Sequence, residues 1–168
     1  KTGIVKEDTK LTFLGFGTMN GKDGKPFKTR EGGVMRLENL IREITEKMYE
    51  KITENRTVSE EEAKATAKMV GMAAIKYGDL SNQAAKDYVF DVDRFTSFEG
   101  NTGPYILYTI VRIKSILNRY VQEGGDLSAG KILPAVNASE KNLMLQLSGF
   151  AAMVENAFEE KAPHKICA

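Results

Sequence analysis

The chain has 168 residues, of which 42% are hydrophobic and 28% are charged, a composition typical of ordinary soluble globular proteins. Its 24 lysines and arginines nearly balance its 23 aspartates and glutamates, so the formal charge of +1 gives no overall attraction to nucleic acid or membranes. Cys167 and His164 are the only cysteine and histidine, which excludes an internal disulfide and a zinc site built from several histidines.

The sequence carries no apolar run of membrane-spanning length and no visible secretory signal, so we expect a cytoplasmic protein that does not enter membranes. A single cysteine fits a reducing compartment. The chain begins at Lys1 rather than at methionine, and it stops at Ala168, shortly after Pro163 begins what reads as a new helix. We therefore expect part of a longer protein.

Residues 10–19 read as a β-strand with apolar side chains at Leu11, Phe13 and Phe16, although two glycines weaken this pattern. A glycine- and lysine-rich loop, residues 21–33, follows directly. Glycine permits backbone angles that other residues avoid, and a glycine-rich segment costs more entropy to order, so this loop can change shape around an anion.

The loop also supplies the groups that bind phosphate. Its basic side chains are Lys22, Lys25, Lys28 and Arg30, and the Thr29 hydroxyl lies among them. Charge-assisted hydrogen bonds contribute about 1.5–3 kcal/mol each, so two or three made only in a transition state would speed the loss of a phosphate leaving group. The Gly-x-x-x-x-Gly-Lys-Ser/Thr pattern of a P-loop is absent, and an ordinary exposed loop is the alternative interpretation.

Two helices are predicted next. The first runs from about residue 34 to 52, with apolar side chains every three or four positions: Val34, Leu37, Leu40, Ile41, Ile44, Met48 and Ile52. The second begins after Ser59, which forms a capping box with Glu62, and Gly78 is its expected end. Small alanines on one face of this helix would let a neighbouring element approach closely.

Residues 88–93 read as a second short strand or extended piece. Two isolated strands do not make a stable sheet, so either the first half belongs to a larger sheet or the strand predictions are wrong. Asp91, Asp93 and Glu99 gather three acids here, but their spacing matches no cation-binding loop. We therefore expect capping or surface roles for them, and no metal site.

A turn rich in glycine at residues 98–104 separates a mixed first part from an all-helical second part. This change predicts a domain boundary that divides the chain into residues 1–97 and 98–168. Thr102 or Asn101 is expected to cap a helix with Pro104 in its first turn, ending near Gln122. A final long helix is expected from a cap at Ser139 to about residue 161. The predicted fold is mainly α with a minor β component.

The helix that follows Pro104 has two contrasting faces. Its apolar stripe consists of Ile106, Ile110, Ile113, Leu117 and Tyr120, and nearly opposite lie Tyr105, Tyr108, Arg112 and Arg119. Aromatic rings interleaved with arginines suit stacking on RNA bases and contact with RNA phosphates. The alternative is a helix packed on two sides, whose tyrosines and arginines bind other parts of the protein.

Five strings of residues, in a fixed order, resemble one family. They are Leu14–Met19, the loop at 21–33, Leu37–Leu40, Ala74–Leu80 and Phe98–Tyr108, which begins Phe-Glu-Gly-Asn-Thr. This combination closely resembles the arginyl-tRNA synthetases, which are class I aminoacyl-tRNA synthetases. The resemblance covers nearly the whole chain, and it implies the C-terminal end of a Rossmann-type catalytic domain followed by the first helices of an all-α anticodon-binding domain.

The resemblance also implies a reaction and its partners. The family activates L-arginine with ATP to arginyl-adenylate and passes the arginyl group to tRNA(Arg), so ATP is a substrate, with Mg²⁺ bound alongside it, and no cofactor is held permanently. The arginine pocket would lie mostly outside this chain. The full-length protein is expected to be a monomer.

The loop corresponds to the family's Lys-Met-Ser-Lys-Ser signature, which falls on residues 26–30. Pro26 and Thr29 occupy the two lysine positions, so Lys28 and Arg30, with Lys22 and Lys25 nearby, would supply the charge on the ATP phosphates. The resemblance makes Lys28, Thr29 and Arg30 the catalytic candidates. It makes Tyr105, Tyr108, Arg112 and Arg119 the candidates for tRNA binding.

One family signature is missing from the chain. The His-Ile-Gly-His-like motif needs two histidines and would precede Lys1 in the complete protein. We therefore expect that this chain alone does not aminoacylate tRNA. The alternative function is a non-enzymatic helical module that binds RNA or protein.

Overall fold

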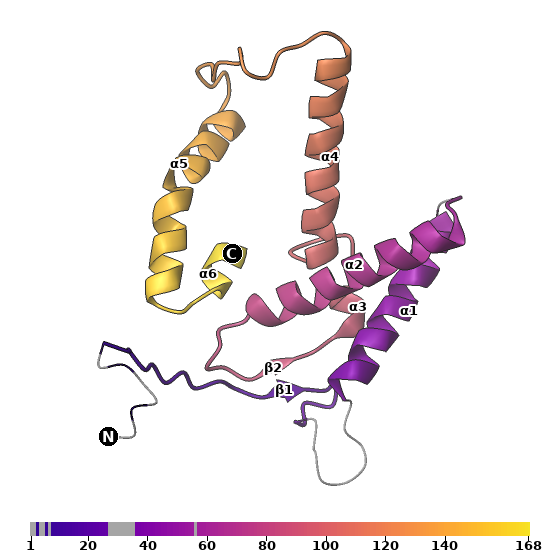
Figure 1. The fold of residues 1–168 in the computed structure, drawn as a ribbon, viewed down its shortest axis with the longest axis vertical. Helices are drawn as coiled ribbons and strands as arrows, with labels where there is room; N and C mark the ends of the chain where they lie inside the picture. The colour runs from indigo at the N-terminus through magenta and orange to yellow at the C-terminus, as the bar shows by residue number, and fades with distance from the viewer. Residues whose placement is uncertain (1–2, 4–5, 7, 27–35, 56) are drawn as a thin grey trace.

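The computed structural model describes residues 3, 6, 8–26, 36–55 and 57–168. In Figure 1 the helices α1 (Leu37–Asn55) and α2 (Glu60–Leu80) form a lower layer with the strands β1 (Met19–Asn20) and β2 (Tyr88–Val89). Above them α4 (Gly103–Gln122) rises from α2, and α5 (Ala138–Glu159) returns toward it. The short helices α3 (Val92–Phe95) and α6 (His164–Cys167) both contact α2. The prediction of a mainly α fold with a minor β component is confirmed.

The main hydrophobic core lies between α1 and α2. It contains Leu40, Ile44 and Met48 from α1, Ala67, Val70, Ala74 and Ile75 from α2, and the rings of Phe90 and Phe95. Ile44 and Met48 are fully buried, as the apolar period of three and four residues predicts. Ala63, Ala67 and Ala74 are also fully buried, so the small side chains of α2 do allow α1 to approach closely.

Among the residues that the structure describes, the two predicted strands pair with each other. β1 and β2 run parallel, with Met19 opposite Tyr88 and Asn20 opposite Val89. The strand prediction for residues 10–18 was wrong, because β1 begins only at Met19, and Leu11, Phe13 and Phe16 are between 84% and 92% exposed. The prediction of a short strand or extended piece at residues 88–93 was right for β2 and for the extended backbone of Asp91, and it was wrong from Val92, where helix α3 begins.

The predicted helix ends agree with the structure at Ser59 but differ from it at two other positions. Ser59 caps α2 by accepting a hydrogen bond from the Glu62 amide, as predicted. Gly78 does not end α2, which continues to Leu80. A Cβ atom at Gly78 would lie 2.9 Å from the Phe95 ring, so this glycine makes room for an aromatic side chain instead of stopping the helix. The cap of α5 is Asn137 rather than Ser139.

The connection between the lower layer and α4 is close-packed. Thr102 caps α4 by accepting from the Tyr105 amide, and its hydroxyl donates to the Ser97 carbonyl at 2.7 Å. Gly103, the first residue of α4, is buried so tightly that a Cβ atom there would lie 2.2 Å from the Ala73 carbonyl oxygen. Only a residue without a side chain fits this crossing of α4 over α2.

A hydrogen-bonded cluster beside this crossing ties α6 to α2. The Tyr77 hydroxyl donates to the Asn101 side-chain oxygen and to the Cys167 carbonyl, the latter at 2.9 Å. The Asn101 amide nitrogen donates to the same carbonyl at 2.7 Å. Burial raises the pKa of the Tyr77 hydroxyl, which keeps it protonated and able to donate. Cys167 is half-buried at the end of α6.

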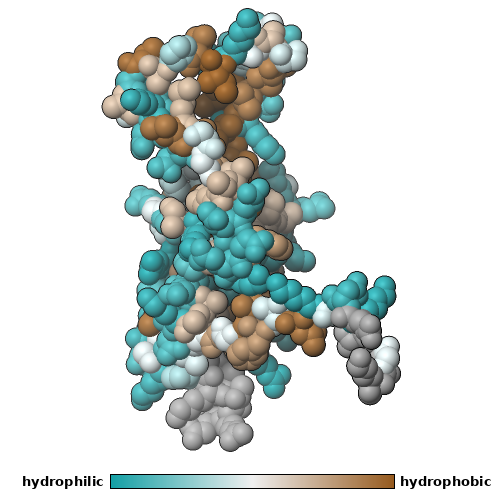
Figure 2. All heavy atoms as spheres, turned by 90° about the vertical axis from the view of Figure 1, so that its left-hand side faces the viewer, coloured by the Kyte–Doolittle hydropathy of each residue, from teal (hydrophilic) through white to brown (hydrophobic). Residues whose placement is uncertain are grey.

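The upper helices expose much apolar surface. The predicted apolar stripe of α4 is uncovered, with Ile106, Ile113 and Tyr120 at 40%, 52% and 49% exposure. Figure 2, which views the molecule from the side of α5, shows apolar side chains gathered at the end where α4 stops and α5 starts. Within the part of the chain that the structure describes, both faces of α4 are largely exposed, and the alternative of a helix packed on two sides stays a prediction about the complete protein.

Candidate functional site

The glycine- and lysine-rich loop begins with a closed turn. The Gly24 amide donates to the Gly21 carbonyl at 2.9 Å, and the Gly21 amide donates to the Lys25 carbonyl at 3.0 Å. The Asp23 carboxylate accepts from the Lys25 amide at 3.1 Å, and Gly24 has a φ of +72°, an angle that favours glycine. An isolated bridge between Asn20 and Pro26 closes the base. The start of the loop is thus a defined structure that continues directly from β1.

Lys22 leaves this turn toward α3. Its ammonium group lies 2.7 Å from an Asp93 carboxylate oxygen and 3.3 Å from an Asp91 carboxylate oxygen. Asp93 also forms an ion pair with Lys47 of α1. Two lysines from distant parts of the chain therefore share one carboxylate.

The charges of this cluster shift the pKa values of its members. The hydrogen bonds from Lys22 and Lys47 lower the pKa of Asp93 to about 2, so this side chain stays a carboxylate at any physiological pH. The hydrogen bonds to Asp93 and Asp91 raise the pKa of Lys22, which stays an ammonium. Asp91 also caps α3 by accepting from the amides of Asp93 and Arg94. The expected capping role of Asp91 is confirmed.

The other loop candidates are placed only in part. The Lys25 backbone closes the turn, and its side chain is exposed. Lys28, Thr29 and Arg30 lie outside the described residues. The assignment of these four residues and Lys22 to ATP stays a prediction.

The candidate RNA-binding face of α4 is exposed. Tyr105 and Tyr108 are each 42% exposed. The Arg112 guanidinium lies 5.7 Å from the centre of the Tyr108 ring and donates to its hydroxyl at 3.0 Å. Arg119 pairs with Glu123 one turn later, at 2.9 Å. These contacts hold two arginines on the surface, and their binding to an RNA phosphate stays a prediction.

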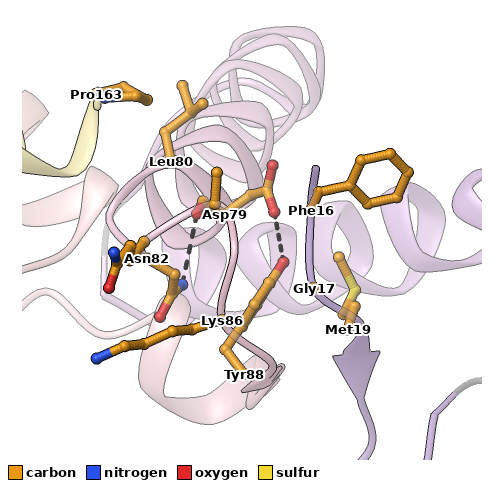
Figure 3. Close-up of a pocket in the computed structure, with 11 residues that line it drawn as sticks. Phe16, Gly17, Met19, Asp79, Leu80, Asn82, Lys86, Tyr88 and Pro163 are labelled. Carbon is orange, nitrogen blue, oxygen red and sulfur yellow. Dashed lines mark hydrogen bonds between the residues drawn. The ribbon is translucent and has the colours of Figure 1, made fainter. Parts of the chain in front are cut away.

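A cavity of about 360 Å³ lies where the segment before β1 meets the end of α2 (Figure 3). Phe16, Met19, Leu80 and Pro163 provide apolar walls. The Tyr88 hydroxyl donates to the Asp79 carboxylate at 2.6 Å, and burial raises the pKa of Tyr88 above its ordinary value. Asp79 and Tyr88 thus satisfy each other, and the cavity presents no activated nucleophile or base.

Sequence reasoning missed the partners of the loop. Lys22 and Lys47 are separated from Asp93 by 71 and 46 residues, so no local pattern pairs them.

The described residues contain no cluster of three or more acidic, histidine or cysteine side chains able to hold a metal ion. A search of the same residues finds no helix long and apolar enough to cross a membrane.

Comparisons with known proteins match each half of the chain to a known domain family. Residues 1–92 match the family described as tRNA synthetases class I (R), catalytic domain, and residues 106–168 match the DALR anticodon binding domain. The chain is 67% identical to the arginine–tRNA ligase of Agathobacter rectalis and 59% identical to that of Alkaliphilus oremlandii. These matches cover 100% and 99% of the chain, but only 30% and 28% of the two relatives.

Solved structures agree with these matches. The arginyl-tRNA synthetase of Thermus thermophilus superposes on 92% of the chain with a TM-score of 0.71 at 25% identity, and the match covers 24% of that protein. The enzyme of Plasmodium falciparum superposes on 79% of the chain with a TM-score of 0.61 at 26% identity. With a catalytic-domain match over more than half of its residues, the chain belongs to the class I arginyl-tRNA synthetase family.

Proposed function

We propose that this chain is the part of an arginine–tRNA ligase in which the catalytic domain meets the anticodon-binding domain. The observation that carries this proposal is the order of the two matched segments within one chain, catalytic before anticodon-binding. The domains would meet near residues 97 and 98, which lie between the matched segments. The complete protein would be a cytoplasmic monomer.

The proposed reaction has two steps. A carboxylate oxygen of L-arginine attacks the α-phosphorus of ATP, the bond to the β-phosphate oxygen breaks, and pyrophosphate leaves with its Mg²⁺. A ribose hydroxyl at the end of tRNA(Arg) then attacks the carbonyl carbon of arginyl-adenylate, loses its proton, and AMP leaves. Most of the arginine pocket lies outside this chain.

The loop serves the first step. Lys28 and Arg30 would bind the oxygens of the departing pyrophosphate, with the Thr29 hydroxyl and Lys25 as further donors. Fixed cations stabilise charge that develops on a leaving group more than charge already present on ATP, which is how they raise the rate. The closed turn at residues 21–25 supports this role, because it holds the start of the loop in one place.

The activity itself is tested with the complete protein. We expect it to charge tRNA(Arg) with radiolabelled arginine, and not with lysine, when ATP and Mg²⁺ are present. The 168-residue chain alone should give no arginine-dependent pyrophosphate exchange, even with tRNA(Arg) added. Failure of the complete protein to charge tRNA would overturn the proposed function, and exchange by the short chain would show that the missing part is not needed.

The exposed face of α4 gives a separate prediction about tRNA. Arg112→Gln and Arg119→Gln in the complete protein should each weaken tRNA(Arg) binding, because each removes a cation that can lie against a phosphate. The dependence of log Kd on log salt concentration should fall by about one unit for each lost phosphate contact. Gel-shift titrations at several salt concentrations measure this.

The control for that titration is Lys64→Gln, which removes an exposed cation from α2 instead of α4. It should leave the affinity and the salt dependence unchanged. If all three variants behave alike, α4 has no special part in tRNA binding.

A further inference from the structure

Asp93 occupies a meeting point of three segments that are far apart in the sequence. One oxygen of its carboxylate contacts Lys22, in the turn that begins the loop, at 2.7 Å. The other oxygen contacts Lys47 in the middle of α1. Asp93 itself belongs to the first turn of α3. The loop, α1 and α3 are therefore connected through one side chain.

The groups around Asp93 are attached to rigid parts of the molecule. Lys47 precedes Met48, which is fully buried in the core. Phe95, two residues after Asp93, is also buried and lies against Gly78 of α2. Asp91 fixes the backbone at Asp93 by accepting its amide hydrogen at 2.9 Å. The Asp93 carboxylate is consequently held in place by Lys47 and by its own backbone, independently of Lys22.

Lys22 is the one member of this cluster that comes from the loop. Its turn is closed by three backbone and side-chain hydrogen bonds, so the position of its ammonium group and that of the turn are coupled. A lysine already bound by two carboxylates has little remaining attraction for a phosphate. The contacts thus favour a role for Lys22 in placing the turn, and not in binding ATP.

We propose that Asp93 is a positioning residue for arginine activation, which acts by holding Lys22 and so fixes the start of the loop against α1 and α3. This inference rests on the proposed function. Lys25, which closes the same turn, would thereby keep a constant place relative to the core. Asp93 touches no substrate in this account and acts only through the loop.

A double-mutant cycle in the complete protein tests the proposal. The variants are Asp93→Asn, Lys22→Met and the two combined, and the readout is kcat/KM for ATP in arginine-dependent pyrophosphate exchange with tRNA(Arg) present. Since exposed ion pairs are modest, each single variant should lower kcat/KM for ATP about three- to fivefold. The double variant should lose clearly less than the product of the two single losses, because both single variants remove the contact between Lys22 and Asp93. Each single variant also removes one further ion pair, that of Asp93 with Lys47 or that of Lys22 with Asp91.

Two further variants serve as controls. Glu60→Gln removes an exposed ion pair with Lys64 on α2 and should leave the kinetics unchanged. Asp93→Glu keeps the negative charge and should therefore retain most of the wild-type kcat/KM for ATP. The effect of Asp93→Asn should also shrink at high salt, because salt screens exposed charges.

The outcomes separate the possible failures. Independent, multiplying losses in the cycle would mean that Lys22 acts on ATP by itself, and would overturn the inference. Unchanged kinetics in Asp93→Asn, or a loss explained by less folded protein with KM for ATP unaltered, would also overturn it. A wild-type protein without arginine-dependent exchange would contradict the proposed function, and the inference with it.

Discussion

Replacing Lys28 or Arg30 with alanine in the complete protein is expected to slow arginyl-adenylate formation by about 10²- to 10³-fold, the usual effect of removing one donor from a developing anion. The affinity for tRNA(Arg) should change little, because these side chains would contact pyrophosphate and not RNA. Arginine-dependent pyrophosphate exchange with tRNA present measures the rate of arginyl-adenylate formation. Filter binding measures the affinity for tRNA(Arg).

The control for this experiment is Lys131→Ala, which removes an exposed lysine from the connection between α4 and α5. It should not alter adenylate formation. Normal activation rates in both Lys28→Ala and Arg30→Ala would remove the loop from the mechanism. A larger loss in one variant than in the other would show which cation contributes most.

The second large effect is expected at the crossing of α4 over α2. Gly103→Ala adds a Cβ atom 2.2 Å from the Ala73 carbonyl oxygen and 2.5 Å from its carbonyl carbon. Backbone atoms of a packed helix cannot move aside as a flexible side chain can, so we expect a loss of about 1–3 kcal/mol in the free energy of unfolding. Urea denaturation of the wild type and the variant measures it.

Gly149→Ala is the matched control, because Gly149 lies inside the exposed helix α5 with nothing within 4 Å of the added Cβ atom. Alanine is about 1 kcal/mol better than glycine in a helix, so this variant should be slightly more stable. The change from glycine to alanine should therefore lower the free energy of unfolding at position 103 and raise it at position 149. A stable Gly103→Ala protein would mean that α4 crosses α2 less closely than described.

The long helices could be predicted because their signals are local. The apolar period of α1, the Ser59 cap of α2 and the Thr102 cap of α4 each depend on residues within a few positions of one another. Gly78 shows where local signals fail. A glycine near a helix end reads as a stop, but here the Phe95 ring, brought by a later segment, occupies the space beside it.

The candidate site also combines features that local sequence can indicate with features that depend on the fold. The candidate cations of the loop were inferred from its composition and from the family signature, and their part in binding ATP stays a prediction. The pairing of Lys22 with Asp93 could not, since it joins residues 71 positions apart and depends on how α3 packs under α2. The apolar residues Leu11, Phe13 and Phe16 indicated a strand, yet a strand also needs a neighbour, and the sequence pattern alone cannot supply one.

The attachment of α4 has a mechanical consequence. Its 20 residues make it about 30 Å long, and the residues buried in the lower layer, Gly103 and Pro104, stand at its very beginning. A helix held at one end acts as a lever, so a tilt of about 10° at its base would carry its far end sideways by about 5 Å at that length. The same tilt would thus move Arg119 by more than the length of a hydrogen bond.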